Sequence, residues 1–148
     1  MRITRQADYA VRAMAYMAGL PLGDRVSTSA LSEAEHIPRP FLTKVISRLA
    51  AGGLVLTSRG MGGGVSLARP SEEITLRNVI EAVDGPIMLS HCLLRAGTCQ
   101  HEDYCAAHDV WSGIQTRFVA DLEAVTMADL AQRRKEKKAQ AQAQAQAG

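Results

Sequence analysis

No apolar run in the sequence approaches the roughly 20 residues that span a bilayer, so no membrane segment is predicted. The most apolar N-terminal stretch, residues 10–22, is interrupted by Arg12 and lacks a small-residue cleavage site, which argues against a signal peptide. Only three cysteines are present, and an odd number disfavours a secreted disulfide scaffold. These absences predict a folded protein of the reducing cytoplasm.

The sequence also lacks the patterns of an enzyme. No paired acid and base constellation stands out. The glycine-rich run at residues 60–64 lacks the Gly-Lys-Ser/Thr ending of a phosphate-binding loop and leads into a predicted strand. Of the 148 residues, 47% are hydrophobic, which suits the core of one domain with an extension. We therefore expect a binding protein, and a small metalloenzyme is the disfavoured alternative.

Charge is distributed unevenly along the chain, although the net charge is only +2. Residues 1–70 carry nine basic and four acidic side chains, whereas residues 71–130 carry three basic and ten acidic ones. Residues 131–148 are basic again, with five basic side chains and one acidic. A basic first half predicts contact with a polyanion, with ordinary surface variation as the alternative.

Three helices are predicted in the first half. The first covers about residues 4–20, and the second is short and capped within residues 27–29. The third begins at Pro40, with Arg39 at the cap position, and ends at the glycine pair 52–53. Its apolar stripe is Leu42, Val45, Ile46 and Leu49, and its opposite face is polar or basic at Thr43, Lys44, Ser47 and Arg48.

A hairpin follows the third helix. Residues 54–58 and 65–68 predict two strands, joined by a basic, glycine-rich tip at residues 59–64. Three short helices followed by a hairpin form a winged helix-turn-helix domain, in which the last helix enters the major groove of DNA and the hairpin follows the minor groove. The predicted fold class is therefore mainly α with a small β-hairpin wing and a long C-terminal dimerisation helix.

The predicted organisation has four parts. Residues 1–85 form the winged helix-turn-helix domain and residues 86–108 a cysteine-bearing loop. Residues 109–132 hold a dimerisation helix and a closing helix, and residues 133–148 form a low-complexity, disordered tail. The dimerisation helix is expected over residues 106–125, and the closing helix opens at a capping box over residues 126–129.

The long helix carries an apolar stripe at Val110, Ile114, Phe118 and Leu122. One exposed helix cannot bury so long a stripe on a domain of this size. A second copy of the chain is the simplest place for it, so the sequence predicts a homodimer through this helix.

All three cysteines, Cys92, Cys99 and Cys105, fall within fourteen residues. Inert core cysteines would scatter among the helices, and clustered thiolates bind zinc or an iron–sulfur cluster. A fourth ligand is then needed. His108, three residues beyond Cys105, is one candidate. Asp8 is another, although its spacing favours an ion pair with Arg12, four residues later, over a role as ligand. A structural zinc site and a metal-free thiol switch remain alternatives.

These residues resemble the iron–sulfur regulator family that includes IscR, NsrR and RirA, from Met1 to about Arg134. The resemblance lies in the opening Met1-Arg-Ile-Thr with Asp8-Tyr9-Ala10, the helix over residues 37–49, the wing over residues 59–64, the three cysteines and the segment 126–130. It implies a homodimeric transcription factor, usually a repressor, whose promoter binding is controlled by a cluster that senses iron status, nitric oxide or redox state.

The resemblance also implies roles for individual residues. Cys92, Cys99 and Cys105 match the cluster cysteines. His108 matches the fourth ligand of IscR-type members, which hold a 2Fe–2S cluster, and Asp8 matches that of NsrR-type members, which hold a 4Fe–4S cluster. Contacts with a pseudo-palindromic double-stranded DNA site are expected from the helices and the wing, at Ser29, Arg39, Pro40, Phe41, Thr43, Lys44, Arg48, Arg59, Gly62 and Gly63.

Overall fold

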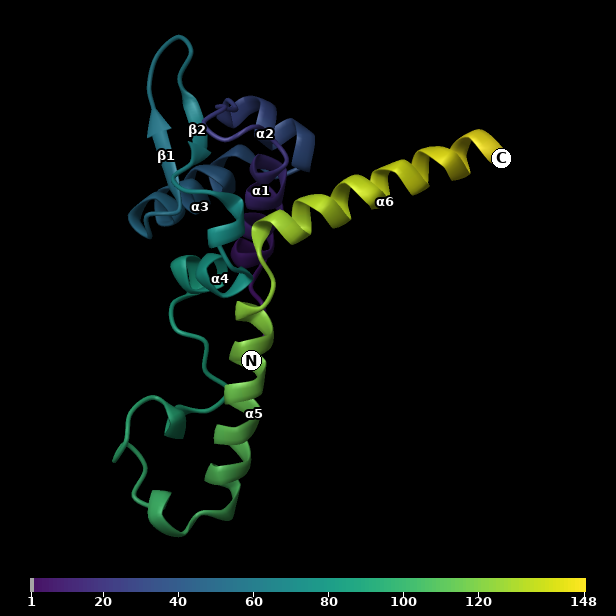
Figure 1. The fold of residues 1–148 in the computed structure, drawn as a ribbon. Coiled ribbons are helices and arrows are strands. Elements are labelled where there is room, and N and C mark those ends of the chain that lie inside the picture. Colours follow the sequence, from purple (N-terminus) through teal and green to yellow (C-terminus); the bar gives the residue numbers. More distant parts are fainter. Residues whose placement is uncertain (1) are drawn as a thin grey trace.

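The first half of the chain folds into three helices and a hairpin (Figure 1). The computed structural model describes residues 2–148. The elements of this half are α1 (Arg5–Ala18), α2 (Thr28–Glu35), α3 (Arg39–Ala51), β1 (Val55–Ser58) and β2 (Gly64–Leu67). This is the order of a winged helix-turn-helix domain, so the predicted fold class is confirmed.

The second half contains three further helices. They are α4 (Leu76–Asp84), α5 (Ala106–Glu123) and α6 (Met127–Ala147), with short 3-10 turns η1 (Ser71–Glu73), η2 (His91–Leu93) and η3 (Glu102–Tyr104) between them. Figure 1 shows α5 running away from the winged-helix domain, with the loop of residues 85–105 around its far end. The helix α6 begins at the domain, packs across α1, and projects away from the domain towards the C-terminus.

Side-chain caps begin several helices, and those of α2 and α6 lie where the sequence predicts them. The hydroxyl of Ser27 accepts a hydrogen bond from the Ala30 N–H, which caps α2. Thr75 with Asn78 and Thr126 with Asp129 each form a reciprocal capping box, at the starts of α4 and α6. Local chemistry therefore sets these boundaries.

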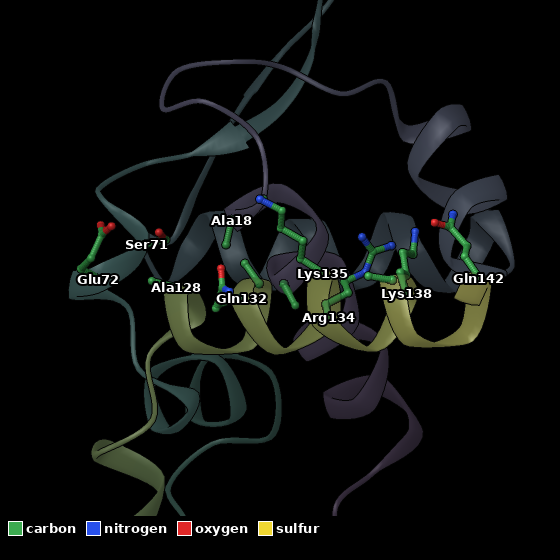
Figure 2. Close-up of a pocket in the computed structure, with 13 residues that line it drawn as sticks. Ala18, Ser71, Glu72, Ala128, Gln132, Arg134, Lys135, Lys138 and Gln142 are labelled. Atoms are coloured by element: carbon green, nitrogen blue, oxygen red, sulfur yellow. The ribbon is translucent and has the colours of Figure 1, made fainter. Parts of the chain in front are cut away.

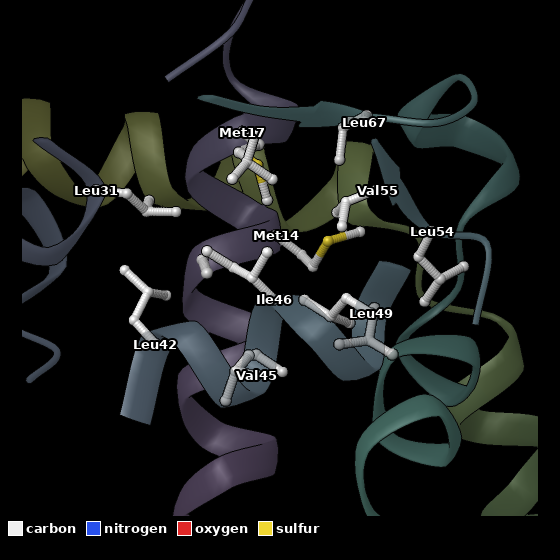
Figure 3. Close-up of a cluster of buried hydrophobic side chains, with 14 of the residues drawn as sticks. Met14, Met17, Leu31, Leu42, Val45, Ile46, Leu49, Leu54, Val55 and Leu67 are labelled. Atoms are coloured by element: carbon white, nitrogen blue, oxygen red, sulfur yellow. The ribbon is translucent and has the colours of Figure 1, made fainter. Parts of the chain in front are cut away.

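The core lies between α1, α3, α4 and the hairpin (Figure 3). The apolar stripe predicted for α3 is buried throughout, and Met14 of α1 lies against it with no exposed surface. Burial of a side chain of this size contributes roughly 1.5–3 kcal/mol. The other fully buried large side chains include Leu31, Leu42, Leu49, Leu54, Ile74 and Met127.

The hairpin is antiparallel, and its base is attached to the helices. Val55 pairs with Leu67, and Ser58 pairs with Gly64 at the far end. Val65 also pairs with Val26, in the loop before α2, through hydrogen bonds of 2.8 and 3.0 Å in the two directions. The wing (residues 55–67) is therefore fixed relative to the helix-turn-helix.

The junction between α5 and α6 is also attached to the domain. The Leu76 N–H donates to the Val125 carbonyl and the Met127 N–H donates to the Ile74 carbonyl, both at 2.8 Å. Met127 itself is fully buried. A movement of α5 would therefore be transmitted directly to the start of α4 and to the core.

Two expectations differ from the structure. The third helix begins at Arg39, not Pro40, because the extended Pro38 takes the cap position and its carbonyl accepts from the Leu42 N–H at 3.0 Å. The tail over residues 133–148, expected to be disordered, is helical to Ala147. Its Ala, Gln, Lys, Arg and Glu residues all favour helices, and glycine occurs only at the last position.

Candidate nucleic-acid interface and cysteine loop

The N-terminal half of α3 turns one face outward. Arg39, Pro40, Phe41, Thr43 and Lys44 are all exposed, because the buried stripe of the same helix faces the core. Five of the six residues of α3 that are predicted to contact DNA therefore lie in its N-terminal half and are open to solvent.

An aromatic contact holds the start of this surface. The Phe41 ring lies edge-on to the Tyr9 ring of α1, with ring centroids 6.1 Å apart, and Phe41 remains 42% exposed. The Arg12 guanidinium lies 5.7 Å from the centroid of the same Tyr9 ring. The start of α3 is thus packed on α1 and keeps apolar surface open to solvent.

Cations near this face are available for an anionic partner. In the described part of the chain, Arg39, Lys44 and Arg59 form no ion pair. Thr43 donates its hydroxyl proton to the Arg39 carbonyl at 2.9 Å, which leaves the oxygen lone pairs free. Exposed arginine and lysine side chains without an acidic partner suit binding to phosphates.

Two residues that are predicted to contact DNA, Arg48 and Ser29, are partly engaged within the protein itself. Arg48 donates from Nη1 to the Val83 carbonyl at 2.7 Å, so its guanidinium binds the C-terminal end of α4. This contact links α3 to α4 and gives Arg48 a structural role that helix periodicity cannot reveal. Ser29 lies half-buried in the first turn of α2.

The tip of the wing combines one cation with several glycines. Arg59 is exposed directly after β1, and Gly62 adopts a φ of +75° that favours glycine. A Cβ at Gly63 would lie 2.5 Å from the Ser58 carbonyl oxygen, so only glycine fits there. Arg59, Gly62 and Gly63 therefore lie together at the tip, as expected.

The cysteine loop is held against α5 by a side-chain amide. Gln115 donates from Nε2 to the Ile87 carbonyl at 2.7 Å and accepts from the Leu89 N–H at 2.8 Å. This double hydrogen bond fixes the chain just before Cys92. A lone glutamine in a helix gives no sequence signal for such a role.

The three thiols are free and half-buried in this loop. Cys92 donates its S–H to Ser90 Oγ at 3.2 Å, and Cys105 immediately precedes α5. Within residues 2–148, no three His, Cys, Asp or Glu side chains come together as a metal-binding group. The structure therefore places the thiols in one loop without assembling a site.

His108 is the candidate ligand with the most informative surroundings. Its Nδ1 is buried and has no hydrogen-bond partner, while its Nε2 lies 3.9 Å from a Glu102 carboxylate oxygen. It occupies the first turn of α5, one turn after Cys105. An unpartnered buried nitrogen is costly, so this atom fits a missing ligand.

Asp8 lies elsewhere. Its Oδ2 is 3.5 Å from Arg12 Nη1, which is the ion pair that its spacing predicts. The helix α1 belongs to the winged-helix domain, whereas the loop that carries the cysteines lies along the far part of α5 (Figure 1). Asp8 and the cysteines are therefore not brought together within one chain.

Sequence reasoning missed a charge cluster where α6 crosses the domain. Glu35, at the end of α2, is buried and forms an ion pair with Arg134 of α6. Arg12 donates to the Glu35 carbonyl, and Arg134 lies 5.1 Å from the centroid of the Tyr16 ring. The only sequence signal is that Glu35 follows Leu31 by four residues and so shares its buried helix face.

A groove of about 620 Å³ runs along the same crossing (Figure 2). Arg134, Lys135 and Lys138 line its α6 side, and Ser71 and Glu72 lie at its other end. Small alanines fill most of the remaining wall. This hollow results from the packing of α6 on α1 and contains no thiol or histidine.

Two pKa shifts accompany helix junctions. A hydrogen bond to Glu123, assisted by the charge of Glu81, raises the pKa of Arg77 and ties α4 to α5. Hydrogen bonds from the Thr126 N–H and hydroxyl lower the pKa of Asp129 in the α6 capping box. Both groups therefore remain charged at neutral pH.

A three-helix unit with an outward basic helix and a glycine-tipped hairpin is the architecture of winged-helix DNA-binding proteins. Comparisons with known proteins identify the family. Residues 3–133 match the Rrf2 family model, described as an iron-dependent transcriptional regulator. The chain is 34% identical over 134 residues to the HTH-type transcriptional regulator IscR of Serratia proteamaculans, covering 90% of this chain and 81% of that protein.

Solved structures agree on the fold. The global cysteine regulator CymR of B. subtilis superposes with a TM-score of 0.75 at 23% identity, covering 90% of this chain and 98% of CymR. IscR of T. potens superposes with a TM-score of 0.73 at 23% identity, covering 93% and 90% respectively. The chain belongs to the Rrf2 family of transcriptional regulators, which confirms the family resemblance drawn from its sequence.

Membership answers two functional questions. The relatives are DNA-binding transcriptional regulators and not enzymes, so the expectation of a non-catalytic, DNA-binding protein is confirmed.

Across residues 2–148, none of the helices combines the length and apolar character needed to traverse a bilayer.

Proposed function

We propose that this chain is a homodimeric, cytoplasmic transcriptional repressor that binds a pseudo-palindromic promoter site, and that an iron–sulfur cluster in its cysteine loop controls this binding. The observation that carries the proposal is the position of the loop. Three free thiols and an unpartnered histidine nitrogen lie at one end of α5, and the other end of α5 is hydrogen-bonded to the DNA-binding domain.

The DNA-binding half of the proposal rests on exposed cations. Arg39 and Lys44 at the start of α3 and Arg59 at the wing tip are exposed, and in the proposed complex they would neutralise phosphates on either side of a groove. The exposed Phe41 and Thr43 between them are the candidates for contact with base edges. Binding through several phosphate contacts should weaken steeply with salt.

The part of the proposal that concerns the homodimer rests on α5. None of its eighteen residues is buried, although they include an apolar series with Val110 58% exposed and Trp111 45% exposed. So much apolar surface on one isolated helix suits a matching helix from a second copy. A light-scattering mass twice that of the 15.9 kDa chain is expected, and a monomer that still binds DNA with full affinity would contradict it.

The donor set fits an iron–sulfur cluster in its chemistry. Three thiolates and an imidazole nitrogen are suitable ligands for iron, and the buried Nδ1 of His108 lacks any other partner. Cys92, Cys99, Cys105 and His108 would hold a 2Fe–2S cluster. With Asp8 in place of His108, supplied by the partner subunit, the site would suit a 4Fe–4S cluster. A bound cluster would supply a link sensitive to iron, nitric oxide or oxidation.

The chain itself provides the coupling from loop to DNA. Gln115 attaches the loop to the middle of α5, and Arg77 attaches the end of α5 to α4 through Glu123. The backbone pairing of Leu76 with Val125 continues this path into the core. A change in the loop would bias the orientation of α5 and thereby the relative position of the two DNA-binding domains.

The test is a gel shift on the promoter of this chain's own gene, with anaerobically purified protein before and after removal of iron. We expect a visible absorption band, stoichiometric iron and sulfide, and promoter affinity that differs between the two forms. Cys99→Ala should abolish the band and the difference in affinity, whereas Ser112→Ala on α5 should preserve both. Equal affinity of the two forms would refute the coupling.

A metal-free thiol switch is the second candidate, and one observation favours it. The described residues do not gather three donors into a site, while each thiol is free. This alternative predicts a colourless anaerobic protein whose DNA affinity changes with peroxide. A colourless protein with stoichiometric zinc would instead indicate a structural zinc site.

A further inference from the structure

Within residues 2–148, Met61 has the most exposed large apolar side chain, with a relative exposure of 104%. It lies between β1 and β2 at the end of the wing, which projects beyond the helices in Figure 1. An apolar side chain held fully in water gains nothing in the free protein. This side chain would therefore be buried only in a complex with a binding partner.

The backbone around Met61 is a closed turn. The Gly63 N–H donates to the Gly60 carbonyl at 3.0 Å, which makes Met61 and Gly62 the two central residues. The φ of +75° at Gly62 is the positive value that the third position of a type II turn requires. Met61 is therefore presented at the apex of an ordered turn.

The direction of the tip is fixed by the domain. A Cβ at Gly64 would overlap the Val26 carbonyl, so the hairpin backbone is packed directly on the loop before α2. Val26 and Val65 add two backbone hydrogen bonds there. The apex therefore keeps its orientation relative to α3 and its basic surface.

The tip is also narrow. Of residues 59–63, three are glycines, and the only side chains are those of Arg59 and Met61. A slender element with one cation and one apolar side chain fits the minor groove, which is only about 6 Å wide. Apolar wedges, methionine among them, enter base steps from this groove and kink the duplex.

We propose that Met61 inserts between two base pairs of the minor groove at each half-site, while Arg59 contacts the adjacent phosphates or the groove floor. The unbranched thioether chain is flexible enough to enter a partly opened step. Pyrimidine–purine steps open most easily, so Met61 selects such a step beneath the wing without any hydrogen bond to a base. This inference rests on the proposed binding of the wing to DNA.

The experiment uses the full-length dimer and a duplex of about 30 base pairs from the promoter of its own gene, long enough for two half-sites. 2-Aminopurine replaces adenine at successive steps beneath the wing. At saturating protein we expect increased fluorescence at one pyrimidine–purine step in each half-site. A fluorescence increase reports loss of base stacking, which a groove contact alone does not produce.

Three variants separate the wedge from other contacts. Met61→Gln keeps the chain length but removes the apolar tip, and should abolish the fluorescence increase and weaken binding about tenfold, as expected for losing burial of much of one apolar side chain. Met61→Leu should retain both. Leu56→Gln removes another exposed apolar side chain, 60% exposed on β1, and should change neither.

The outcomes distinguish the two proposals. Tight, salt-sensitive binding without a fluorescence increase, or with an increase unchanged in Met61→Gln, would refute the wedge and leave the proposed function standing. Absence of any promoter binding would refute both. Because Met61 is fully exposed in a turn, the variants should unfold at the wild-type temperature, which excludes misfolding as the cause.

Discussion

Arg134 of α6 forms an ion pair with Glu35, the buried carboxylate at the end of α2. The pair joins the helix that follows α5 to the helix-turn-helix, 99 residues earlier in the chain. Arg12 adds a second, more distant charge contact, with 4.0 Å between its Nε and a Glu35 carboxylate oxygen. Through Glu35, the position of α6 is thus coupled to that of α2.

Replacing Arg134 should therefore be costly. Arg134→Leu leaves a carboxylate that is only 10% exposed with the weaker Arg12 contact, and we expect destabilisation by about 2 kcal/mol in urea unfolding. Arg133→Leu is the matched control, because Arg133 forms no ion pair within residues 2–148. A double variant with Glu35→Leu should recover part of the loss; equal effects of the two arginine variants would contradict this role.

The contact of Gly64 with Val26 makes a second prediction. Gly64→Ala should destabilise the protein by about 1–3 kcal/mol, because its φ of +147° and the Val26 carbonyl both exclude a Cβ. Promoter binding should weaken as the wing loses its attachment.

Gly113 supplies the control for this substitution in the interior of α5. A Cβ there would meet only Arg117 Nη1, at 3.6 Å, so Gly113→Ala should stabilise the helix by up to about 1 kcal/mol. Thermal unfolding and gel shifts measure both variants. Wild-type stability and binding in Gly64→Ala would show that the wing base tolerates rearrangement.

Gln115 makes a prediction about the cysteine loop. Gln115→Ala removes the acceptor of the Leu89 N–H and the donor to the Ile87 carbonyl. Amide exchange at Leu89 should become about fivefold faster, as expected for a lost hydrogen bond worth about 1 kcal/mol. Thr116→Ala, at the exposed neighbouring position, should leave this amide unchanged. Hydrogen exchange followed by NMR provides the measurement. Unaltered protection in Gln115→Ala would show that these two hydrogen bonds do not hold the loop against α5.

The capping box of α6 should respond to acid. Because hydrogen bonds from Thr126 lower the pKa of Asp129 below its ordinary value of 3.8, the folded state favours the charged carboxylate. The stabilisation is complete above that ordinary value and is lost as the pH falls through the lowered folded pKa. A carboxyl-carbon NMR titration should show the lowered midpoint. Thr126→Ala should return it toward 3.8, and an unshifted wild-type midpoint would contradict the box.

Much of the winged-helix domain could be predicted from local pattern. Helical spacing of Leu42, Val45 and Leu49 identified the buried face of α3, and cap residues identified the starts of α2 and α6, because both depend on residues a few positions apart. The glycine-rich tip was recognisable for the same reason, since its positive φ values are a local requirement. The prediction of a disordered tail was wrong, because low sequence complexity indicated disorder whereas the individual residues of the tail favour a helix.

The sequence by itself determined the helices, the wing, the basic face of α3 and the gathering of three thiols in one loop, since these follow from spacing along the chain. Only the tertiary structure decided that Arg48 binds the Val83 carbonyl, that Arg134 pairs with Glu35, and that α1, which carries Asp8, lies away from the cysteine loop. Contacts of this kind join residues 35 to 99 positions apart, and they depend on how helices pack, which no local periodicity specifies.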